Sequence, residues 1–215
     1  MEYFGRYMDF INYIESFTDV RTRGWFMVNN SNVIILTTVA YLLLVRLGKR
    51  IMKKRQPFQL KKIILIYNIC VAIASAYIMY ELYMSTTLLK FSWFCSFKKP
   101  MDDSDPNEMR LATAIWLYYL TKYVETLDSF FFVLRKKNNQ LSGLHLYHHS
   151  MMILYAGLTV KWYPVEMTYS PCMINSGVHV IMYIYYGLST LGPSVARYLW
   201  WKKYLTLIQM VGPTH

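Results

Sequence analysis

Five long apolar runs constrain the fold more than any other feature of the chain. They cover residues 31–47, 60–89, 111–134, 142–160 and 172–191, and a shorter sixth run begins near residue 204. At about 1.5 Å per residue, a helix of about 20 residues crosses a hydrocarbon core of about 30 Å. The sequence therefore predicts an all-α, polytopic transmembrane helix bundle with five full spans and a truncated sixth. Buried helix pairs of a soluble protein are the alternative reading of such runs.

The basic residues of the chain gather between these runs. The formal charge is +11, and residues 46–62 contain eight Lys and Arg without any acid. Loops 135–140 and 192–203 are also basic, whereas loops 90–110 and 161–171 are mixed or nearly neutral. The positive-inside rule then puts the three basic loops in the cytosol and the N-terminus outside it. This alternation favours the lipid bilayer as the partner of the chain and argues against nucleic acid.

The chain reads as one membrane-embedded domain over residues 1–215. Residues 1–27 are expected to be an N-terminal surface segment, residues 28–211 the helix bundle, and residues 212–215 an atypical tail. The N-terminus lacks the basic segment and short apolar core of a cleaved signal peptide. The three cysteines, Cys70, Cys95 and Cys172, form no CxxC pair, so they predict neither a disulfide framework nor a zinc site.

The third run carries three charged residues, Lys122, Glu125 and Asp128, at positions i, i+3 and i+6. Charges are costly at membrane depth, so each is expected to face the bundle interior and to be paired. Lys122 and Glu125 can pair on their own helix, which leaves Asp128 to orient an imidazole of the next helix. A purely structural ion pair is the alternative interpretation.

Three of the five histidines lie close together in the fourth run, at His145, His148 and His149. Their i, i+3, i+4 spacing puts them on one face of a helix. The fifth run presents a second polar face, made of Asn175, His179, Met182 and Tyr186. Asp128 and the three histidines lie at similar depths, so we expect one pocket that opens to the cytosol and runs inward.

Two chemistries suit this pocket. Histidines bind metals, but a membrane di-iron centre needs many more imidazoles than this chain provides, so no metal site is predicted. The number of histidines alone would still allow a site for a single metal ion. Alternatively, a histidine acts as nucleophile or general base in acyl-transfer or carbon–carbon bond chemistry. Neighbouring imidazole or amide N–H groups would then stabilise an enolate or oxyanion.

Four ordered motifs resemble those of the very-long-chain fatty acid elongases, the membrane 3-oxoacyl-CoA synthases of the endoplasmic reticulum. The segment QPFQLKKIILIYN at residues 56–68 is also similar to that family, and the likeness covers about residues 25–211. The motifs are KxxExxD(T/S) at Lys122, Glu125, Asp128 and Ser129; HxxHH at His145, His148 and His149; NxxxHxxMYxYY at Asn175, His179, Met182, Tyr183, Tyr185 and Tyr186; and TxxQ at Thr206 and Gln209.

The resemblance implies condensation of a long-chain acyl-CoA with malonyl-CoA, giving a 3-oxoacyl-CoA two carbons longer, free CoA and carbon dioxide. It implies no cofactor besides these substrates, and a multi-pass protein of the endoplasmic reticulum membrane. A homodimer and other enzymes of the elongation cycle are further partners that it suggests. The site residues it implies are catalytic His145, His148, His149, His179, Asp128 and Asn175, and substrate-binding Lys122, Glu125, Met182, Tyr185, Tyr186, Thr206 and Gln209.

The chain departs from the family pattern after Val211. Elongases usually have seven spans, whereas here the sixth run ends after about eight apolar residues at Gly-Pro-Thr-His. We expect a truncated gene product or a fragment, unstable or poorly active on its own. Two alternatives to an elongase enzyme are a non-catalytic membrane partner of a full-length elongase and a metal-dependent membrane lipid oxidase.

Overall fold

A computed structural model describes residues 5–6, 9–10, 13, 15–91, 104–162, 166–192, 195 and 197–201. The regular secondary structure of these residues is α-helical throughout, which confirms the predicted all-α class. The helices are α2 (Ser31–Met52), α3 (Lys61–Leu88), α4 (Pro106–Glu125), α5 (Leu127–Leu134), α6 (Gly143–Trp162) and α7 (Glu166–Ser189).

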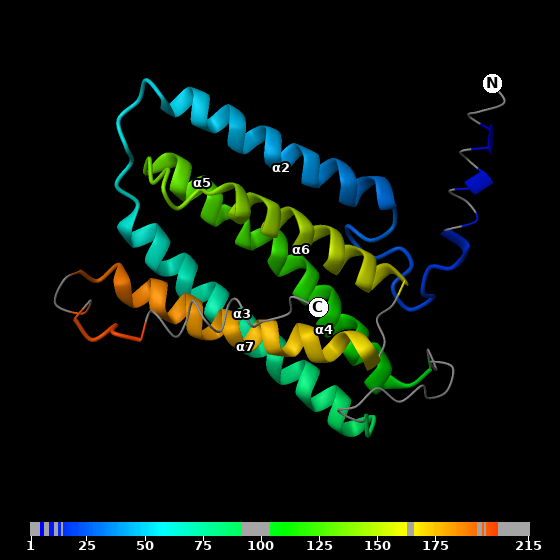
Figure 1. Cartoon of the computed structure of the whole chain (residues 1–215). Coiled ribbons are helices and arrows are strands. Elements are labelled where there is room, and N and C mark those ends of the chain that lie inside the picture. Colours follow the sequence, from blue (N-terminus) through cyan, green and yellow to red (C-terminus); the bar gives the residue numbers. More distant parts are fainter. Residues whose placement is uncertain are drawn as a thin grey trace.

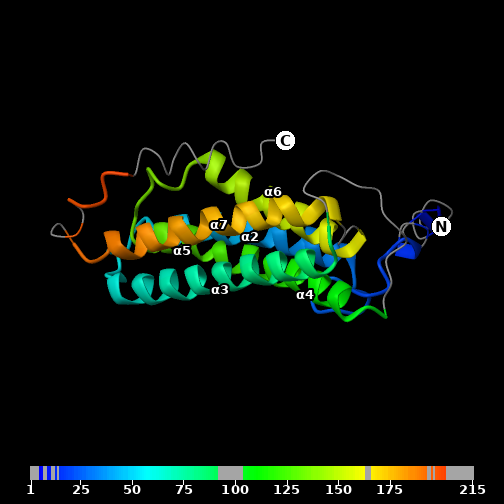
Figure 2. The ribbon, with the colours of Figure 1, turned by 90° about the horizontal axis from the view of Figure 1, so that it is seen from below.

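The helices form an elongated bundle in which successive long segments run in opposite directions (Figures 1 and 2). Helix α3 packs against α7 and α4, α4 packs against α6, and α6 packs against α2. One end of the bundle therefore collects the connection between α2 and α3, the end of α5, the start of α6 and the end of α7 (Figure 1). This is the end that carries the basic loops, as expected from the charge pattern.

Two helices are long and apolar enough to cross a membrane by length and composition, α2 and α3. Both coincide with predicted runs, and α3 agrees with residues 60–89 to within one residue at each end. Helix α4, which contains the first part of the third run, carries Lys122 and Glu125, and α6 carries three histidines, which makes both helices less apolar. Polar side chains thus concentrate in the helices where the sequence predicts the site.

The start of the last helix differs from expectation. The sequence predicts a loop over residues 161–171, yet α7 begins at Glu166 and contains Pro171. A proline in the second turn of a helix removes one backbone hydrogen bond and limits the distortion to the helix start. The helix therefore begins about one and a half turns before the apolar run does.

Residues 15–28 contribute more to the interior than the expected surface segment would. Arg21, Thr22 and Val28 are buried, with 6%, 0% and 0% of their surface exposed. Arg21 forms ion pairs with Asp19 at 2.8 Å and with Glu108 of α4 at 3.4 Å. This paired guanidinium fastens the segment to the start of α4.

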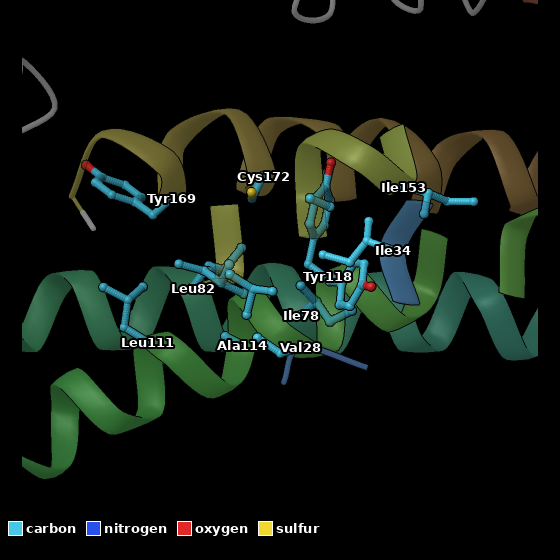
Figure 3. Packing of buried hydrophobic residues seen from close by; sticks show 14 residues of the cluster. Val28, Ile34, Ile78, Leu82, Leu111, Ala114, Tyr118, Ile153, Tyr169 and Cys172 are labelled. Atoms are coloured by element: carbon cyan, nitrogen blue, oxygen red, sulfur yellow. The ribbon is translucent and has the colours of Figure 1, made fainter. Parts of the chain in front are cut away.

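The main hydrophobic cluster joins residues of α2, α3, α4, α6 and α7, and Figure 3 shows how its side chains pack. It takes residues from α3, α4 and α7, namely Ile78, Leu82, Leu111, Ala114, Tyr118, Tyr169 and Cys172. Val28 and Ile34 close the cluster from the N-terminal side, together with Ile153 of α6. Large apolar and aromatic side chains in mutual contact hold the helices at the spacing that positions the polar residues farther along.

Gly157 of α6 marks a close approach of three helices. A Cβ atom at this position would lie 2.9 Å from Ile34 Cδ1 of α2 and 3.0 Å from Tyr119 Cε2 of α4. We expect Gly157→Ala to lower the free energy of unfolding by about 1–3 kcal/mol through overpacking. Thermal unfolding in detergent measures the effect. Gly143→Ala is the control, since nothing lies within 4 Å of its Cβ position; equal effects would contradict the close-packing argument.

A buried lysine at the end of α6 is paired with the N-terminal segment. Lys161, fully buried, contacts Glu15 Oε2 at 2.6 Å, and Ser31 donates a hydrogen bond to Glu15 Oε1 at 2.8 Å. Partial burial acts to raise the pKa of Glu15, but the hydrogen bonds and charge of Lys161 and the hydrogen bond of Ser31 outweigh it and lower the pKa below 4.5.

This contact predicts a pH-dependent contribution to stability. Because the folded pKa of Glu15 is depressed, its stabilising effect is present above the unfolded pKa and is lost as the pH falls through the folded value. We expect Glu15→Gln to cost about 1 kcal/mol at neutral pH. The difference between the variant and the wild type should shrink below pH 4.5 in thermal unfolding series. A difference that stays constant down to strongly acidic pH would contradict the ion pair.

Candidate functional site

The third apolar run is not one continuous helix, because it breaks at Thr126 between two of its charged residues. The Thr126 hydroxyl donates to the carbonyl of Tyr123 at 2.7 Å, and its amide donates to the same carbonyl at 3.1 Å. A hydrogen bond from a threonine hydroxyl to a carbonyl of the preceding turn competes with the regular backbone hydrogen bonds of the helix and tightens the turn locally. Glu125 ends α4, while Asp128 lies in the first turn of α5, so the break sets their relative directions.

Lys122 is the centre of a buried polar network between α4 and α7. Its ammonium donates to Glu125 Oε1 at 2.9 Å, to Glu125 Oε2 at 3.0 Å and to Asn175 Oδ1 at 2.9 Å. Tyr118 donates to the same Asn175 oxygen at 3.0 Å, and the ammonium lies 4.3 Å from the centre of the Tyr118 ring. The charged pair that the sequence predicted is present, and its surroundings compensate its burial.

His179 joins this network through Glu125. Its Nδ1 lies 2.8 Å from Glu125 Oε1, and His179 and Glu125 are 7% and 2% exposed. A carboxylate accepts, so Nδ1 carries the proton and Nε2 is left as the second functional nitrogen of the ring. Asn175 is similarly constrained: its oxygen accepts two hydrogen bonds, which leaves its amide N–H groups as donors. The network therefore presents an imidazole nitrogen and an amide donor of fixed orientation.

Asp128 does not orient a histidine, contrary to the sequence-based prediction. Its Oδ2 accepts a hydrogen bond of 2.8 Å from the Tyr183 hydroxyl, and Tyr183 packs edge-on against Tyr67 of α3. The carboxylate that orients an imidazole is Glu125, and that imidazole belongs to α7. The break at Thr126 puts Glu125 and Asp128 on separate helices, α4 and α5, so the two carboxylates face different partners.

The first histidine of the α6 cluster is held by a hydroxyl. His145 Nε2 lies 2.9 Å from Ser129 Oγ, and Ser129 Oγ lies 2.7 Å from the hydroxyl of Tyr41 on α2. Ser129 is fully buried and Tyr41 is 5% exposed. The chain Tyr41–Ser129–His145 therefore links α2, α5 and α6 and occupies the ring nitrogen of His145 that faces the bundle.

The other two histidines of the cluster have different environments. The His149 ring is buried, with centroids 4.4 Å from His145 and 5.7 Å from His148. His148 is exposed, and within the described part of the chain neither of its ring nitrogens has a hydrogen-bond partner. His148 is close enough to His179, Lys122 and Glu125 to interact with them electrostatically. The structure thus brings the α6 histidines and the α4–α7 network into one neighbourhood.

The remaining predicted residues take varied positions. Met182 packs against the cluster of Tyr67, Val71 and Tyr183. Tyr186 is 37% exposed, and Tyr185 stacks edge-on against Trp201 at 5.1 Å. Their roles in binding substrate stay predictions. Thr206 and Gln209 lie outside the described residues.

Three tyrosines contribute to the site that the sequence reading missed: Tyr41, Tyr67 and Tyr118. Each lies in an aromatic-rich helix where tyrosine is common, so the residue type alone carries no signal. Tyr118 stands four positions before Lys122, a helical spacing that puts both on one face and could have indicated the contact. Among residues 15–91, 104–162 and 166–192, no group of three or more His, Cys, Asp or Glu is placed to hold a metal ion.

The chain is similar in sequence to a known protein family and to several of its members. The sequence profile of the GNS1/SUR4 family, named ELO, matches residues 26–212. Very long chain fatty acid elongase 5 of Mus musculus is 41% identical over 193 residues, covering 90% of this chain and 63% of the relative. Elongase 4 of Mus musculus is 40% identical over 205 residues, covering 95% and 65%. Human elongase 4 is 38% identical over 205 residues, covering 95% and 64%.

The match therefore extends over nearly all of this chain, while the chain spans just under two thirds of the length of these curated relatives. All four motif-bearing segments fall inside the matched residues, and the apolar helices α2 and α3 agree with a membrane protein. The chain belongs to the GNS1/SUR4 family of membrane proteins, which includes the very long chain fatty acid elongases.

Proposed function

We propose that this chain condenses a long-chain acyl-CoA with malonyl-CoA, releasing CoA and carbon dioxide and leaving a 3-oxoacyl-CoA two carbons longer. The observation that carries the proposal is the exposed imidazole of His148 beside the buried network of Lys122, Glu125 and His179. An unpaired imidazole is a competent nucleophile, and a fixed imidazole with an amide donor suits a developing oxyanion. The similar proteins are very long chain fatty acid elongases by name, which supports the same class of reaction.

In the first half of the reaction, a ring nitrogen of His148 attacks the thioester carbonyl. The carbon–sulfur bond breaks, CoA leaves as the thiol with the imidazole proton, and the acyl group stays on His148 as an acyl-imidazole. His145 is the weaker candidate nucleophile, because its Nε2 is engaged by Ser129. His149 is buried between the other two rings and serves better to position them.

In the second half, malonyl-CoA loses carbon dioxide and the electron pair of the broken bond forms an enolate. The enolate carbon attacks the acyl carbonyl, the new carbon–carbon bond forms, and the nitrogen–acyl bond to His148 breaks. The exposed His148 ring takes up a proton from water as it leaves, which restores the neutral imidazole. His179 Nε2, when protonated, and the Asn175 amide are the donors for the enolate oxygen in this proposal, since their other polar atoms are already engaged. Lys122 and Glu125 hold both donors in place without touching the substrate.

The same proposal assigns the chain to the endoplasmic reticulum membrane, with α2, α3, the α4–α5 pair, α6 and α7 as its spans. The basic loops would attract the phosphates of CoA at the cytosolic surface, and the interior of the bundle would house the acyl chain. No cofactor besides the two CoA substrates is proposed. A homodimer and contacts with other elongation enzymes stay predictions.

Radiolabelled malonyl-CoA tests this proposal. Microsomes from a host without elongases of its own, expressing the full chain, are given an unlabelled long-chain acyl-CoA. We expect label in a 3-oxoacyl product two carbons longer, above the background of empty-vector microsomes although the activity of this chain alone is low. A well-expressed chain that incorporates no label beyond empty-vector microsomes would refute the proposal. Label that appears only with a co-expressed full-length elongase would instead favour a non-catalytic partner.

The hydroxyl chain from Tyr41 provides a smaller prediction. Tyr41→Phe removes the hydroxyl that contacts Ser129, while the ring stays in its apolar cluster. We expect kcat to fall by up to about tenfold, with little change in KM, because a looser Ser129 positions His145 less well. The paired variant Ser129→Ala should lower kcat more. If Tyr41→Phe changed only the melting temperature, the hydroxyl would be structural.

A further inference from the structure

Four cationic side chains converge at the end of the bundle that carries the basic loops. Lys49 and Arg50 lie in the last turn of α2, Lys53 follows it, and Lys136 follows α5. They line a cavity of about 480 Å³ together with Met52, Val133 and Asn138, which we call the cationic pocket. The Lys136 ammonium donates to the carbonyl of Lys53 at 3.3 Å, which joins the two sides of the pocket.

The position of Lys136 is fixed by the way α5 ends. Its φ is +55°, a left-handed conformation that is uncommon for a residue with a side chain. Its amide donates to the carbonyl of Val133 at 3.1 Å, and the amide of Lys137 donates to Phe132 at 2.9 Å. This hydrogen-bond pattern closes the helix and holds the backbone of Lys136 at the pocket.

No acid compensates these charges. Residues 46–62 and 135–140, the two loops that supply the cations, contain neither Asp nor Glu. Within the described part of the chain, none of the four cations lies within 4.0 Å of a carboxylate, whereas Lys122 and Lys161 are both paired. Four like charges around one cavity produce a strong positive potential, and an anion is the ligand that lowers it.

An apolar groove adjoins the cationic pocket and shares Met52 and Val133 with it. The groove has a volume of about 260 Å³ and is lined also by Gly48, Ile51, Arg55, Phe58, Phe130 and Leu134. Ile51 and Phe58 are each 49% exposed, and Leu44 and Leu47 of α2 extend the exposed apolar surface beyond them. A ligand that fills both cavities therefore needs an anionic group joined to hydrocarbon by no more than a short linker.

We propose that the cationic pocket and the apolar groove together bind one anionic phospholipid of the cytosolic leaflet. The headgroup phosphate would lie among Lys49, Arg50, Lys53 and Lys136, and an acyl chain would follow the groove onto α2. The 22 residues of α2 span about 33 Å, which puts its last turn at the level of lipid phosphates. CoA also carries phosphates, but a long polar arm separates them from its acyl chain, so it matches the adjoining groove poorly.

Lipid retention by the purified full chain tests this proposal. The protein is held in mixed micelles with equal phosphatidylserine and phosphatidylcholine, washed, and its bound lipids are quantified. We expect preferential retention of phosphatidylserine, and a loss of that preference by about tenfold in Lys53→Gln/Lys136→Gln, as expected of removing two cations. The control is Lys61→Gln/Lys62→Gln, which removes the same charge from exposed residues at the start of α3 that line neither cavity.

Each outcome decides the proposal. Retention that weakens with salt in the wild type, and that the control variant preserves, supports it. Equal losses in both double variants would mean that net charge alone attracts lipid, which overturns the site. Displacement of phosphatidylserine by free CoA would reassign the pocket to nucleotide phosphates and also overturn the lipid assignment. If Lys53→Gln/Lys136→Gln is not monodisperse, Lys49→Gln/Arg50→Gln replaces it. Since the readout is bound lipid, failure here leaves the condensation proposal unaffected.

Discussion

His148→Ala is expected to abolish condensation, lowering kcat by about 10³-fold or more, with the protein still folded. Removing the nucleophile of a covalent mechanism leaves only the binding and oxyanion contributions to the rate. His148 is exposed and has no hydrogen-bond partner among the described residues, so its loss removes no structural contact that the bundle depends on. A large effect on rate should therefore come with a small effect on stability.

Two measurements are needed for this variant. Condensation is followed by malonyl-CoA incorporation, and covalent transfer is followed by attachment of a labelled acyl group to the protein in the absence of malonyl-CoA. The control is Leu144→Ala, one turn earlier on α6 and 77% exposed, which should retain both signals. If His148→Ala kept near-normal condensation, or if the wild type never retained the labelled acyl group, His148 would not be the nucleophile.

Much of the site was predictable because helical spacing is a local property. Lys122 and Glu125 stand three residues apart, and this alone brings their side chains together on α4. The contact between His145 and His149 follows in the same way from a spacing of four. The grouping of α4, α6 and α7 around these residues followed from the cost of polar groups in an apolar interior.

What could not be predicted depends on tertiary geometry. Glu125 contacts His179 as well as its predicted partner Lys122, and Asp128 bonds Tyr183 instead of a histidine. The helix breaks at Thr126 between these two carboxylates, and a threonine in an apolar run signals no break. The helix start at Glu166 was hidden by Pro171, which is a helix breaker in most contexts. The contact of Tyr41 with Ser129 joins residues 88 positions apart, and no local pattern indicates it.

The second large effect concerns the buried pair of Lys122 and Glu125. Single substitutions in this pair should destabilise the protein strongly, and the double substitution should not. Lys122→Met leaves the Glu125 carboxylate buried, and Glu125→Leu leaves the ammonium buried, in each case without its main counter-charge. We expect either single variant to lose about 3–5 kcal/mol of unfolding free energy. The double variant Lys122→Met/Glu125→Leu should recover most of this loss, because it buries no uncompensated charge.

Activity should not recover with stability. In the double variant His179 has lost the carboxylate that accepts from its Nδ1, and Asn175 has lost the ammonium that holds its amide. His179 is then free to rotate and Asn175 is held by Tyr118 alone, so the stable double variant should condense at least about 10²-fold more slowly than the wild type.

Thermal unfolding in detergent, paired with the condensation assay, separates the structural role of the pair from its positioning role. The control is the pair of Arg110 and Glu81, whose Arg110 side chain is 33% exposed. A more exposed pair contributes less, so Arg110→Met should change stability far less than either Lys122→Met or Glu125→Leu and leave kcat unchanged. A stable double variant with near-normal activity would show that Lys122 and Glu125 only hold the bundle together. If the double variant were as unstable as either single variant, the loss of unfolding free energy would come from packing. It would then not come from a buried charge left without its counter-charge.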